Sequence, residues 1–409
     1  MPSTMAPFVK VKQGIKKLMR QESLSPLGPS REPHAVGQPS SVRFLATLRS
    51  LMLVWLLVGA ACQSAPEYDV QITRQVILSP SHKVAPYSVA RASNGDLLIA
   101  GANNPGNYRA WAMRLSNAGV AKWEYLDGPP DGWVDYSKNN QSFYSASELS
   151  KGNTLLCGIK RGDGTKMVAF LVRIGVSGNV IDERILTPAN DGYPLGIRCL
   201  PWGDGVAVIT TLAVLPKGIG WLIKLDADGN VLWERFGDQF ISGDAMPATD
   251  GGLYLMSGTE AFKIDRDGNL LAHHGIPGSE QQFVHSPVAT SDILVASMLS
   301  TLDTVVFGFD PELNGPKRTA TIKNAGIKRC LELADGSLAL FGSSFDGQAT
   351  ASVARIYKNG DVKNYLLEPK FQSGWFYDAV ASGTGPDEFA TVRQLNDSGK
   401  GAITWVSLK

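Results

Sequence analysis

The chain repeats a two-part pattern along most of its length. In the clearest copy, a polar turn at 94–96 leads into an apolar strand, and an alternating strand at 110–115 then ends in a tight glycine turn. The glycine of this second turn recurs at Gly119, Gly178, Gly229, Gly268, Gly315 and Gly360. The intervals between these glycines are 59, 51, 39, 47 and 45 residues. A period of about 48 residues, with several strands in each unit, predicts the blades of a β-propeller.

The first part of the pattern occurs seven times and indicates the number of blades. Its copies begin at Asn94, Lys151, Asp204, Asp250, Ser291, Asp335 and, in a weaker form, Gly385. The last copy stops without a fourth strand, whereas residues 68–78 form an unassigned strand ahead of the first copy. We therefore predict an all-β propeller of seven four-stranded blades, with six or eight as alternatives. The N-terminal strand would complete the last blade and close the ring.

The segment 220–233 carries the fullest version of the repeat. It reads Gly-Trp-Leu-Ile-Lys-Leu-Asp-Ala-Asp-Gly-Asn-Val-Leu-Trp. This segment resembles the units of bacterial PQQ-like propellers and related short-repeat propellers, and the likeness extends over residues 68–409. The resemblance implies a fold but no particular activity, because propellers serve as enzymes, scaffolds and binding modules alike.

A second sequence feature indicates the protein's cellular localisation. Residues 50–61 are mostly apolar and end in small residues, which is typical of a signal peptide and too short for a membrane-spanning helix. The run Val-Gly-Ala-Ala before Cys62 resembles the lipobox of bacterial lipoproteins, with Gly59 where that family usually has Leu. This resemblance implies lipidation of the Cys62 thiol, and the following Gln63 implies the outer membrane. The alternative is ordinary secretory cleavage, which would yield a soluble periplasmic or secreted protein.

The chain therefore divides into four predicted parts. Residues 1–41 are a disordered leader or sequence upstream of the true start, 42–61 the signal peptide, 62–67 a lipidated tether and 68–409 the propeller. The net charge is +1, but residues 1–61 carry eight Lys or Arg and two Glu, which leaves −5 for the rest. This balance gives no reason to expect nucleic acid as a partner, and 44% apolar residues exclude a disordered chain.

Few motifs in the chain could carry chemistry. The Asp-x-Asp-Gly-Asn segments at 226–230 and 265–269 suggest calcium, but a twelve-residue calcium loop needs a final Glu where this chain has Gly237 and Ile276. Asp-Gly and Gly-Asn also suit tight hairpin turns, which is how we interpret both segments. No Cys-x-x-Cys, histidine cluster, Gly-x-Ser-x-Gly elbow or phosphate loop occurs. We therefore predict no metal, no cofactor and no catalytic residue.

Three cysteines lie within the repeats, at 157, 199 and 330. Cys199 and Cys330 fall six residues before the first turn of their units, in a column of mainly small residues. We expect both to fill space between blades. Their units are the third and the sixth, so they would lie across the ring and would not bond to each other.

The position before that column holds charged residues. Its seven members are Ser88, Ser145, Arg198, Asp244, Val284, Arg329 and Asp378. Together with the nearby His285, the charged members Arg198, Asp244, Arg329 and Asp378 would line the mouth of a polar channel and form part of a binding site. The alternative is that they only satisfy backbone groups and one another at the strand ends.

Two linkers on the same face carry aromatic residues. The linker between the first and second units holds Trp133 and Tyr136, and the linker into the seventh unit holds Trp375 and Tyr377. The first and seventh blades are neighbours in a closed ring, so these side chains would converge and could anchor a protein or glycan partner. Alternatively, they pack down as lids over the blade ends.

These observations predict a lipid-anchored module of the bacterial envelope, monomeric by itself, that binds or scaffolds a protein or glycan. The alternative is an enzyme with its site at the channel mouth: a lyase, a lactonase or a quinone-dependent dehydrogenase. Quinone-dependent enzymes that resemble this architecture are larger eight-bladed rings with a disulfide between adjacent cysteines. No two cysteines are adjacent in this chain, so the resemblance to these enzymes is incomplete.

Overall fold

The structure, a computed structural model, describes much of the chain from Val70 to Leu408. The described residues are 70–79, 83–103, 109–127, 141–162, 166–188, 192–214, 218–240, 244–257, 260–276, 293–298, 303–344, 350–365, 367, 375–383, 385–395 and 400–408. Residues 1–69, with the predicted leader, signal peptide and Cys62, lie outside this set. No helix in the described part of the chain is long and apolar enough to cross a membrane.

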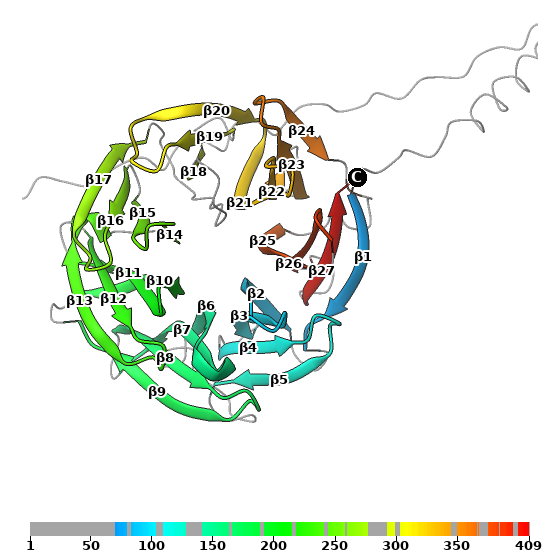
Figure 1. The fold of residues 1–409 in the computed structure, drawn as a ribbon. Coiled ribbons are helices and arrows are strands. Elements are labelled where there is room, and N and C mark those ends of the chain that lie inside the picture. The colour runs from blue at the N-terminus through cyan, green and yellow to red at the C-terminus, as the bar shows by residue number, and fades with distance from the viewer. Residues whose placement is uncertain are drawn as a thin grey trace, which may run out of the picture. The chain divides into compact units, whose positions relative to one another are not determined.

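Antiparallel sheets stand around a central axis and form a ring (Figure 1). Six of them are four-stranded blades. The first four blades consist of β2 (Val84–Arg91), β3 (Leu97–Asn103), β4 (Arg109–Leu115) and β5 (Ala121–Leu126); β6 (Ser142–Glu148), β7 (Thr154–Arg161), β8 (Met167–Ile174) and β9 (Val180–Leu186); β10 (Tyr193–Trp202), β11 (Gly205–Ala213), β12 (Ile219–Leu225) and β13 (Val231–Gly237); and β14 (Asp244–Pro247), β15 (Leu253–Ser257), β16 (Glu260–Ile264) and β17 (Leu270–Gly275).

The remaining sheets complete the ring. Two are four-stranded blades, made of β21 (Ala325–Glu332), β22 (Leu338–Ser344), β23 (Thr350–Ile356) and β24 (Val362–Tyr365), and of β25 (Trp375–Ala381), β26 (Glu388–Gln394), β27 (Gly401–Leu408) and β1 (Val70–Ile77). The last is a three-stranded sheet of β18 (Ile293–Met298), β19 (Thr304–Phe309) and β20 (Pro316–Ile322). The described residues include two short 3-10 helices, η1 (Ser150–Gly152) and η2 (Asp238–Phe240).

The predicted all-β propeller is confirmed, but the prediction of seven four-stranded blades is wrong. Six blades have four strands, and the sheet of β18 to β20 has three among the described residues. β18 begins directly after the polar turn of its repeat, which is the position of the second strand in the other units. The prediction placed a first strand, with Val284 and His285, within residues 277–292, which lie outside the described residues.

Ring closure agrees with the prediction. β1 pairs antiparallel with β27, from Val70 opposite Leu408 to Ile77 opposite Ala402, so the N-terminal strand is the outer strand of the last blade. The Arg74 guanidinium on β1 lies 3.5 Å from the centroid of the Trp405 ring. It also donates a hydrogen bond of 2.6 Å to the carbonyl of Asn117 in the β4–β5 turn. β1 therefore ties the last blade to the first.

Apolar packing between successive sheets holds the ring together. β4 is buried at every position, which is expected for a strand covered by another sheet on each face. One cluster joins Leu171 of β8 to Val208 of β11, and another joins Phe341 of β22 to Phe389 of β26. The cysteines follow this pattern: Cys199 and Cys330 are buried and free, as predicted, in clusters between neighbouring sheets.

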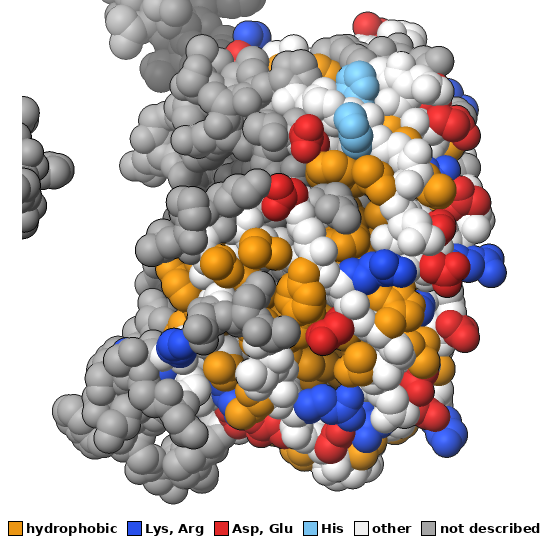
Figure 2. Space-filling model, turned by 90° about the vertical axis from the view of Figure 1, so that its left-hand side faces the viewer, with side chains coloured by type: hydrophobic (Ala, Val, Ile, Leu, Met, Phe, Trp, Pro, Cys, Tyr) orange, Lys and Arg blue, Asp and Glu red, His pale blue; other side chains and the backbone are white. Residues whose placement is uncertain are grey.

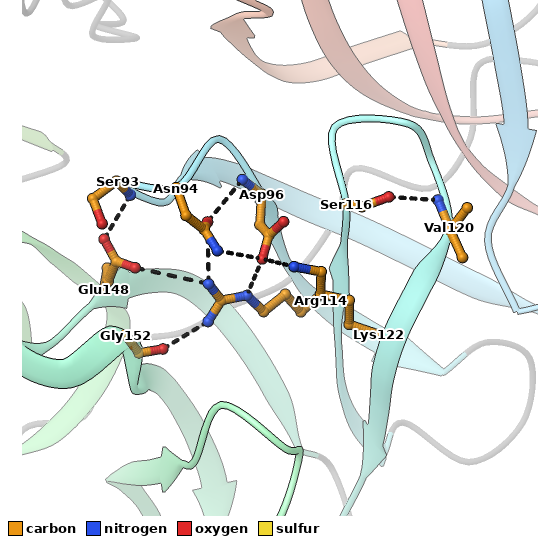
Figure 3. Close-up of polar contacts among 9 residues, drawn as sticks. All are labelled: Ser93, Asn94, Asp96, Arg114, Ser116, Val120, Lys122, Glu148 and Gly152. Atoms are coloured by element: carbon orange, nitrogen blue, oxygen red, sulfur yellow. Dashed lines mark hydrogen bonds and ion pairs between the residues drawn. The ribbon is translucent and has the colours of Figure 1, made fainter.

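An ion pair recurs within the repeats, and in the first blade it is buried and also contacts the next blade. In Figure 3 the Arg114 guanidinium of β4 donates to Asp96 at 2.8 Å and to the carbonyl of Gly152, in the next blade, at 2.6 Å. Glu148 of β6 accepts the backbone N–H of Ser93 at 2.6 Å. Equivalent pairs, Lys263 with Asp250 and Arg355 with Asp335, both have an N–O separation of 2.7 Å. On β4, β16 and β23, a basic residue near the end of the strand therefore holds the turn between the first two strands of its own blade.

The turns between third and fourth strands confirm the hairpin interpretation of the Asp-x-Asp-Gly-Asn segments. The Asp226 carboxylate accepts the backbone N–H groups of Asp228 at 2.9 Å and Asn230 at 2.7 Å. The Asp265 carboxylate accepts the equivalent N–H groups of its own turn. These carboxylates stabilise the turn backbone.

The outer strands face solvent. Figure 2 views the ring from the side that carries β13 and β17, where hydrophobic side chains lie among charged ones. The first two residues of three outer strands are exposed and apolar: Val180 and Ile181, Val231 and Leu232, and Leu270 and Leu271. The polar and charged residues between them divide this apolar surface into short stretches.

Candidate functional site

The first strand of each four-stranded blade lies nearest the axis, and these inner strands line the centre of the ring (Figure 1). Five of them, β2, β6, β10, β21 and β25, contain a β-bulge, where one residue has no partner on the neighbouring strand. The unpaired residues are Tyr87, Tyr144, Leu195, Lys328 and Tyr377. A bulge redirects the side chain of its extra residue, and such features are common near functional sites.

All five bulge residues line one cavity of about 460 Å³. The Tyr87 and Tyr144 rings stack with centroids 5.6 Å apart and planes 18° apart, and Tyr377 meets Tyr87 edge-on at 6.3 Å. Tyr144 is 40% exposed and Leu195 is 60% exposed, so the apolar surface remains accessible. Burial raises the pKa values of the Tyr144 and Tyr377 hydroxyls, which therefore stay protonated at neutral pH. We call these five residues the bulge ring.

Four charged residues adjoin the bulge ring, and we call them the charged belt: Arg198, Asp244, Arg329 and Asp378. Arg198 forms an ion pair with Asp244 of the next blade, and Arg329 Nε lies 3.4 Å from Asp378 Oδ1 of its next blade. The Asp378 carboxylate also accepts the backbone N–H of Val89, across a further blade boundary, at 3.1 Å. These predicted residues thus satisfy one another and the backbone, and Arg198, Asp244 and Asp378 also line the cavity.

The charged belt contributes to the walls of two cavities. A second cavity of about 320 Å³ shares three lining residues, Ser88, Arg198 and Asp378, with the first. Arg329 lines only the second cavity. Because the same side chains contribute to both walls, the belt lies at the boundary between the two spaces.

The electrostatic environment differs between Arg198 of the charged belt and Lys328 of the bulge ring. Burial would lower the pKa of the Arg198 guanidinium, but the nearby Asp244 and Asp378 carboxylates outweigh it and raise that pKa. Burial lowers the pKa of the Lys328 ammonium, because a low-dielectric environment disfavours the charged form. The site therefore contains one cation stabilised by carboxylates and one that burial destabilises.

Several predicted site residues are not part of this arrangement. Trp133, Tyr136 and His285 lie outside the described residues. The prediction that Trp375 and Tyr377 lie on a linker loop is wrong, because both belong to β25 and pair with β26 or lie in its bulge. Their neighbour Phe376 is fully buried against Phe341, so only part of this aromatic run faces the channel.

Four of the five bulge residues, all except Tyr377, were not predicted from the sequence. Tyr87, Tyr144 and Lys328 each stand directly before a member of the polar column, as Tyr377 does. This column of large side chains is visible in the aligned repeats and could have indicated the site. Leu195 could not be found in this way, because its bulge lies three residues before Arg198.

The described residues contain no group of three His, Cys, Asp or Glu side chains that could hold a metal ion. No protein-family model and no curated protein matches the sequence. Solved structures that match include the WD40 β-propeller domain of Doa1, at 12% identity and a TM-score of 0.50, with 83% of this chain and 97% of that chain covered.

Two further matches belong to protein complexes. BBS1N in complex with ARL6DN shares 10% identity, with a TM-score of 0.52 over 84% of this chain and 98% of that chain. A chain of the mitotic checkpoint complex shares 7% identity, with a TM-score of 0.56 over 94% of this chain and 99% of that chain. At these identities the matches show the β-propeller fold alone. The PQQ-like repeat family expected from residues 220–233 stays a prediction.

Proposed function

We propose that this propeller is a protein-interaction module that binds a segment of a partner protein at the bulge ring. The observation that carries this proposal is the convergence of five bulge residues, from five inner strands, on one accessible cavity. Tyrosines that combine apolar rings with polar hydroxyls are frequent anchors of protein interfaces. The solved structures of BBS1N with ARL6DN and of the mitotic checkpoint complex support the proposal, because similar propellers take part in protein complexes.

The dimensions of the site favour a segment over a whole domain. A cavity of about 460 Å³ is within the range of sites that enclose small ligands. Such a volume accommodates a few side chains of an extended peptide or loop. The exposed Leu195 and Tyr144 at its edge would contact the residues on either side of that segment.

Site-specific photo-crosslinking tests this proposal. A benzophenone amino acid replaces Tyr144 in one variant and the exposed Ile185 of outer strand β9 in a matched control. We expect a defined protein adduct from the Tyr144 position that Tyr87→Ala reduces several-fold, and no such adduct from Ile185. Equal adducts at both positions, or an adduct that carries a glycan and no protein, would contradict the proposed function.

We further propose that a lipid on Cys62 holds this module at the bacterial outer membrane. Two sequence features support the anchor: the lipobox-like residues before Cys62 and the apolar run of 50–61 that precedes them. Cys62→Ser should abolish incorporation of labelled fatty acid, whereas Cys157→Ser, which changes a buried thiol, should not. Labelling that persists in the Cys62→Ser protein would refute the anchor and favour a soluble exported form.

A further inference from the structure

We propose that the charged belt binds a carboxylate of the partner segment, either an acidic side chain or a free C-terminus. This inference rests on the proposed function and names the chemistry of the group that enters the site. It derives from the hydrogen-bonding groups of the belt: its acceptors are already bound by the protein, whereas some of its donors are not.

The carboxylates of the belt are already engaged by the protein. Asp378 Oδ1 accepts the backbone N–H of Ala379 at 2.9 Å, and Oδ2 accepts that of Val89 at 3.1 Å. Asp244 Oδ1 accepts the backbone N–H of Ala245 at 2.9 Å and pairs with Arg198. These carboxylates are held in place by contacts within the protein, so they have little remaining capacity to bind a cationic ligand.

The guanidinium groups retain donors. Each carries five N–H groups in a fixed plane. Among the contacts of the described residues, Arg198 meets Asp244 through Nη1, and Arg329 approaches Asp378 through Nε. Arg329 Nε is buried and forms no hydrogen bond in the described part of the chain. Arg198 lines both cavities, so its remaining donors suit a planar acceptor such as a carboxylate.

A buried hydroxyl supports the same conclusion. Ser88 is 8% exposed and lines both cavities, and its Oγ has no hydrogen-bond partner among the described residues. Ser145, at the same position of the next blade, accepts the backbone N–H of Cys199 at 2.6 Å. An unsatisfied buried hydroxyl costs free energy, which a ligand acceptor at the belt would offset.

Lys328 adds positive charge beside the tyrosines. Burial lowers the pKa of its ammonium group, and an anion in the same cavity would reverse part of that shift. The cavity thus combines donors from Arg198 and Ser88 and the positive charge of Lys328 with tyrosine rings suited to the rest of a peptide. A peptide carboxylate fits this combination better than an inorganic anion, which would leave the rings unused.

Calorimetric titration of the full-length protein with small probes tests the proposal. N-acetyl-glutamate amide carries only a side-chain carboxylate, N-acetyl-tyrosine carries only a terminal one, and N-acetyl-glutamine amide is the neutral match. We expect saturable binding of at least one carboxylate probe, about tenfold tighter than the neutral probe. The better carboxylate identifies the source of the group.

Variants and inorganic phosphate make the test specific. Ser88→Ala and Lys328→Gln should each weaken binding of the carboxylate probe several-fold, whereas Lys323→Gln, a lysine outside both cavities with 73% side-chain exposure, should not. Equal binding of the neutral probe, tighter binding of phosphate, or no carboxylate binding would each overturn the proposal. Crosslinking at Tyr144 reports separately on the proposed function, so a crosslinked partner without carboxylate binding would refute this inference alone.

Discussion

Arg114 shows how a single repeated residue stabilises the ring. Its side chain is 1% exposed, and its guanidinium bonds to Asp96 in its own blade and to the Gly152 carbonyl in the next. Lys122, which is 42% exposed, reaches the same carboxylate at 2.8 Å. The Asp96 carboxylate thus pairs with one buried cation and one exposed cation. Water screens the contact with Lys122 but not the contact with Arg114, so the two contribute differently to the free energy of unfolding.

Asp96→Asn should strongly destabilise the protein. The substitution removes the closer of the two carboxylates paired with buried Arg114 and leaves only Glu148, at 3.8 Å, so we expect a loss of about 3 kcal/mol in the free energy of unfolding. Lys122→Gln is the control, because it removes the exposed partner of the same carboxylate and should cost less than about 1 kcal/mol. Urea denaturation measures both values. Similar losses for the two variants would show that burial does not set the strength of this contact.

The same carboxylate should make stability depend on pH. Burial would raise the pKa of Asp96, but hydrogen bonds from Lys122, Arg114 and Asn94 outweigh it, so the folded-state pKa is below the ordinary value of about 4. A lowered pKa stabilises the fold fully above the ordinary value and progressively less as the pH falls through the folded-state value. The stability difference between wild type and Asp96→Asn should therefore shrink in acid, and a constant difference would contradict this assignment.

At the scale of strands and turns, the third-to-fourth-strand hairpins are positioned by glycine and by the neighbouring blade. Gly178 has a φ of +91°, and a Cβ added there would lie 2.6 Å from the Cβ of Trp123 on β5 of the preceding blade. Gly360 has a similar φ of +88°, but an added Cβ would meet nothing within 4 Å. Comparing substitutions at Gly178 and Gly360 therefore distinguishes the cost of backbone strain from the cost of disturbed packing between blades.

Gly178→Ala should therefore destabilise the protein more than Gly360→Ala. Both variants place a side chain in the left-handed region, which costs about 1–2 kcal/mol. Only Gly178→Ala must also push the turn away from Trp123, so we expect a clearly lower midpoint in thermal unfolding for that variant. Gly196→Ala, at a glycine with open space and no positive φ, controls for the substitution itself. Equal midpoints for Gly178→Ala and Gly360→Ala would show that the hairpin does not depend on its neighbour.

The inner strands show where prediction from sequence ends. The polar column of Arg198, Asp244 and Asp378 was predicted, because its members keep a constant distance from a recognisable turn. The bulges that direct Tyr87 and Tyr144 into the cavity were not predicted. The aligned repeats do show a column of large residues directly before the polar column, but a bulge is a change in the pairing register of two strands, which the sequence alone does not reveal. Mutual pairing of the charged column was one of two alternatives from the sequence, but that Arg198 pairs with Asp244 depends on the geometry between blades.

At the scale of the whole molecule, the repeat predicted the ring and its closure more reliably than its strand count. The unassigned strand at the N-terminus matched a missing fourth strand at the C-terminus. This match predicts closure whatever the number of strands in any other blade. The count of four-stranded blades assumed that every polar turn is preceded by an inner strand. In the unit that contains Ser291, the described residues provide only three strands.

Closure through β1 leads to a prediction about the ring as a whole. Arg74→Ala removes the stacking on Trp405 and the hydrogen bond to the Asn117 carbonyl, which together should cost about 1–3 kcal/mol. Because both contacts lie where the last blade meets the first, amide hydrogen exchange should accelerate in β1, in β27 and in the β4–β5 turn. The distant β10–β13 blade should keep its protection, and Lys83→Ala, at an exposed lysine before β2, should change neither region. If hydrogen exchange accelerated equally in all blades, β1 would not stabilise the closure locally, and the ring would open as one cooperative unit.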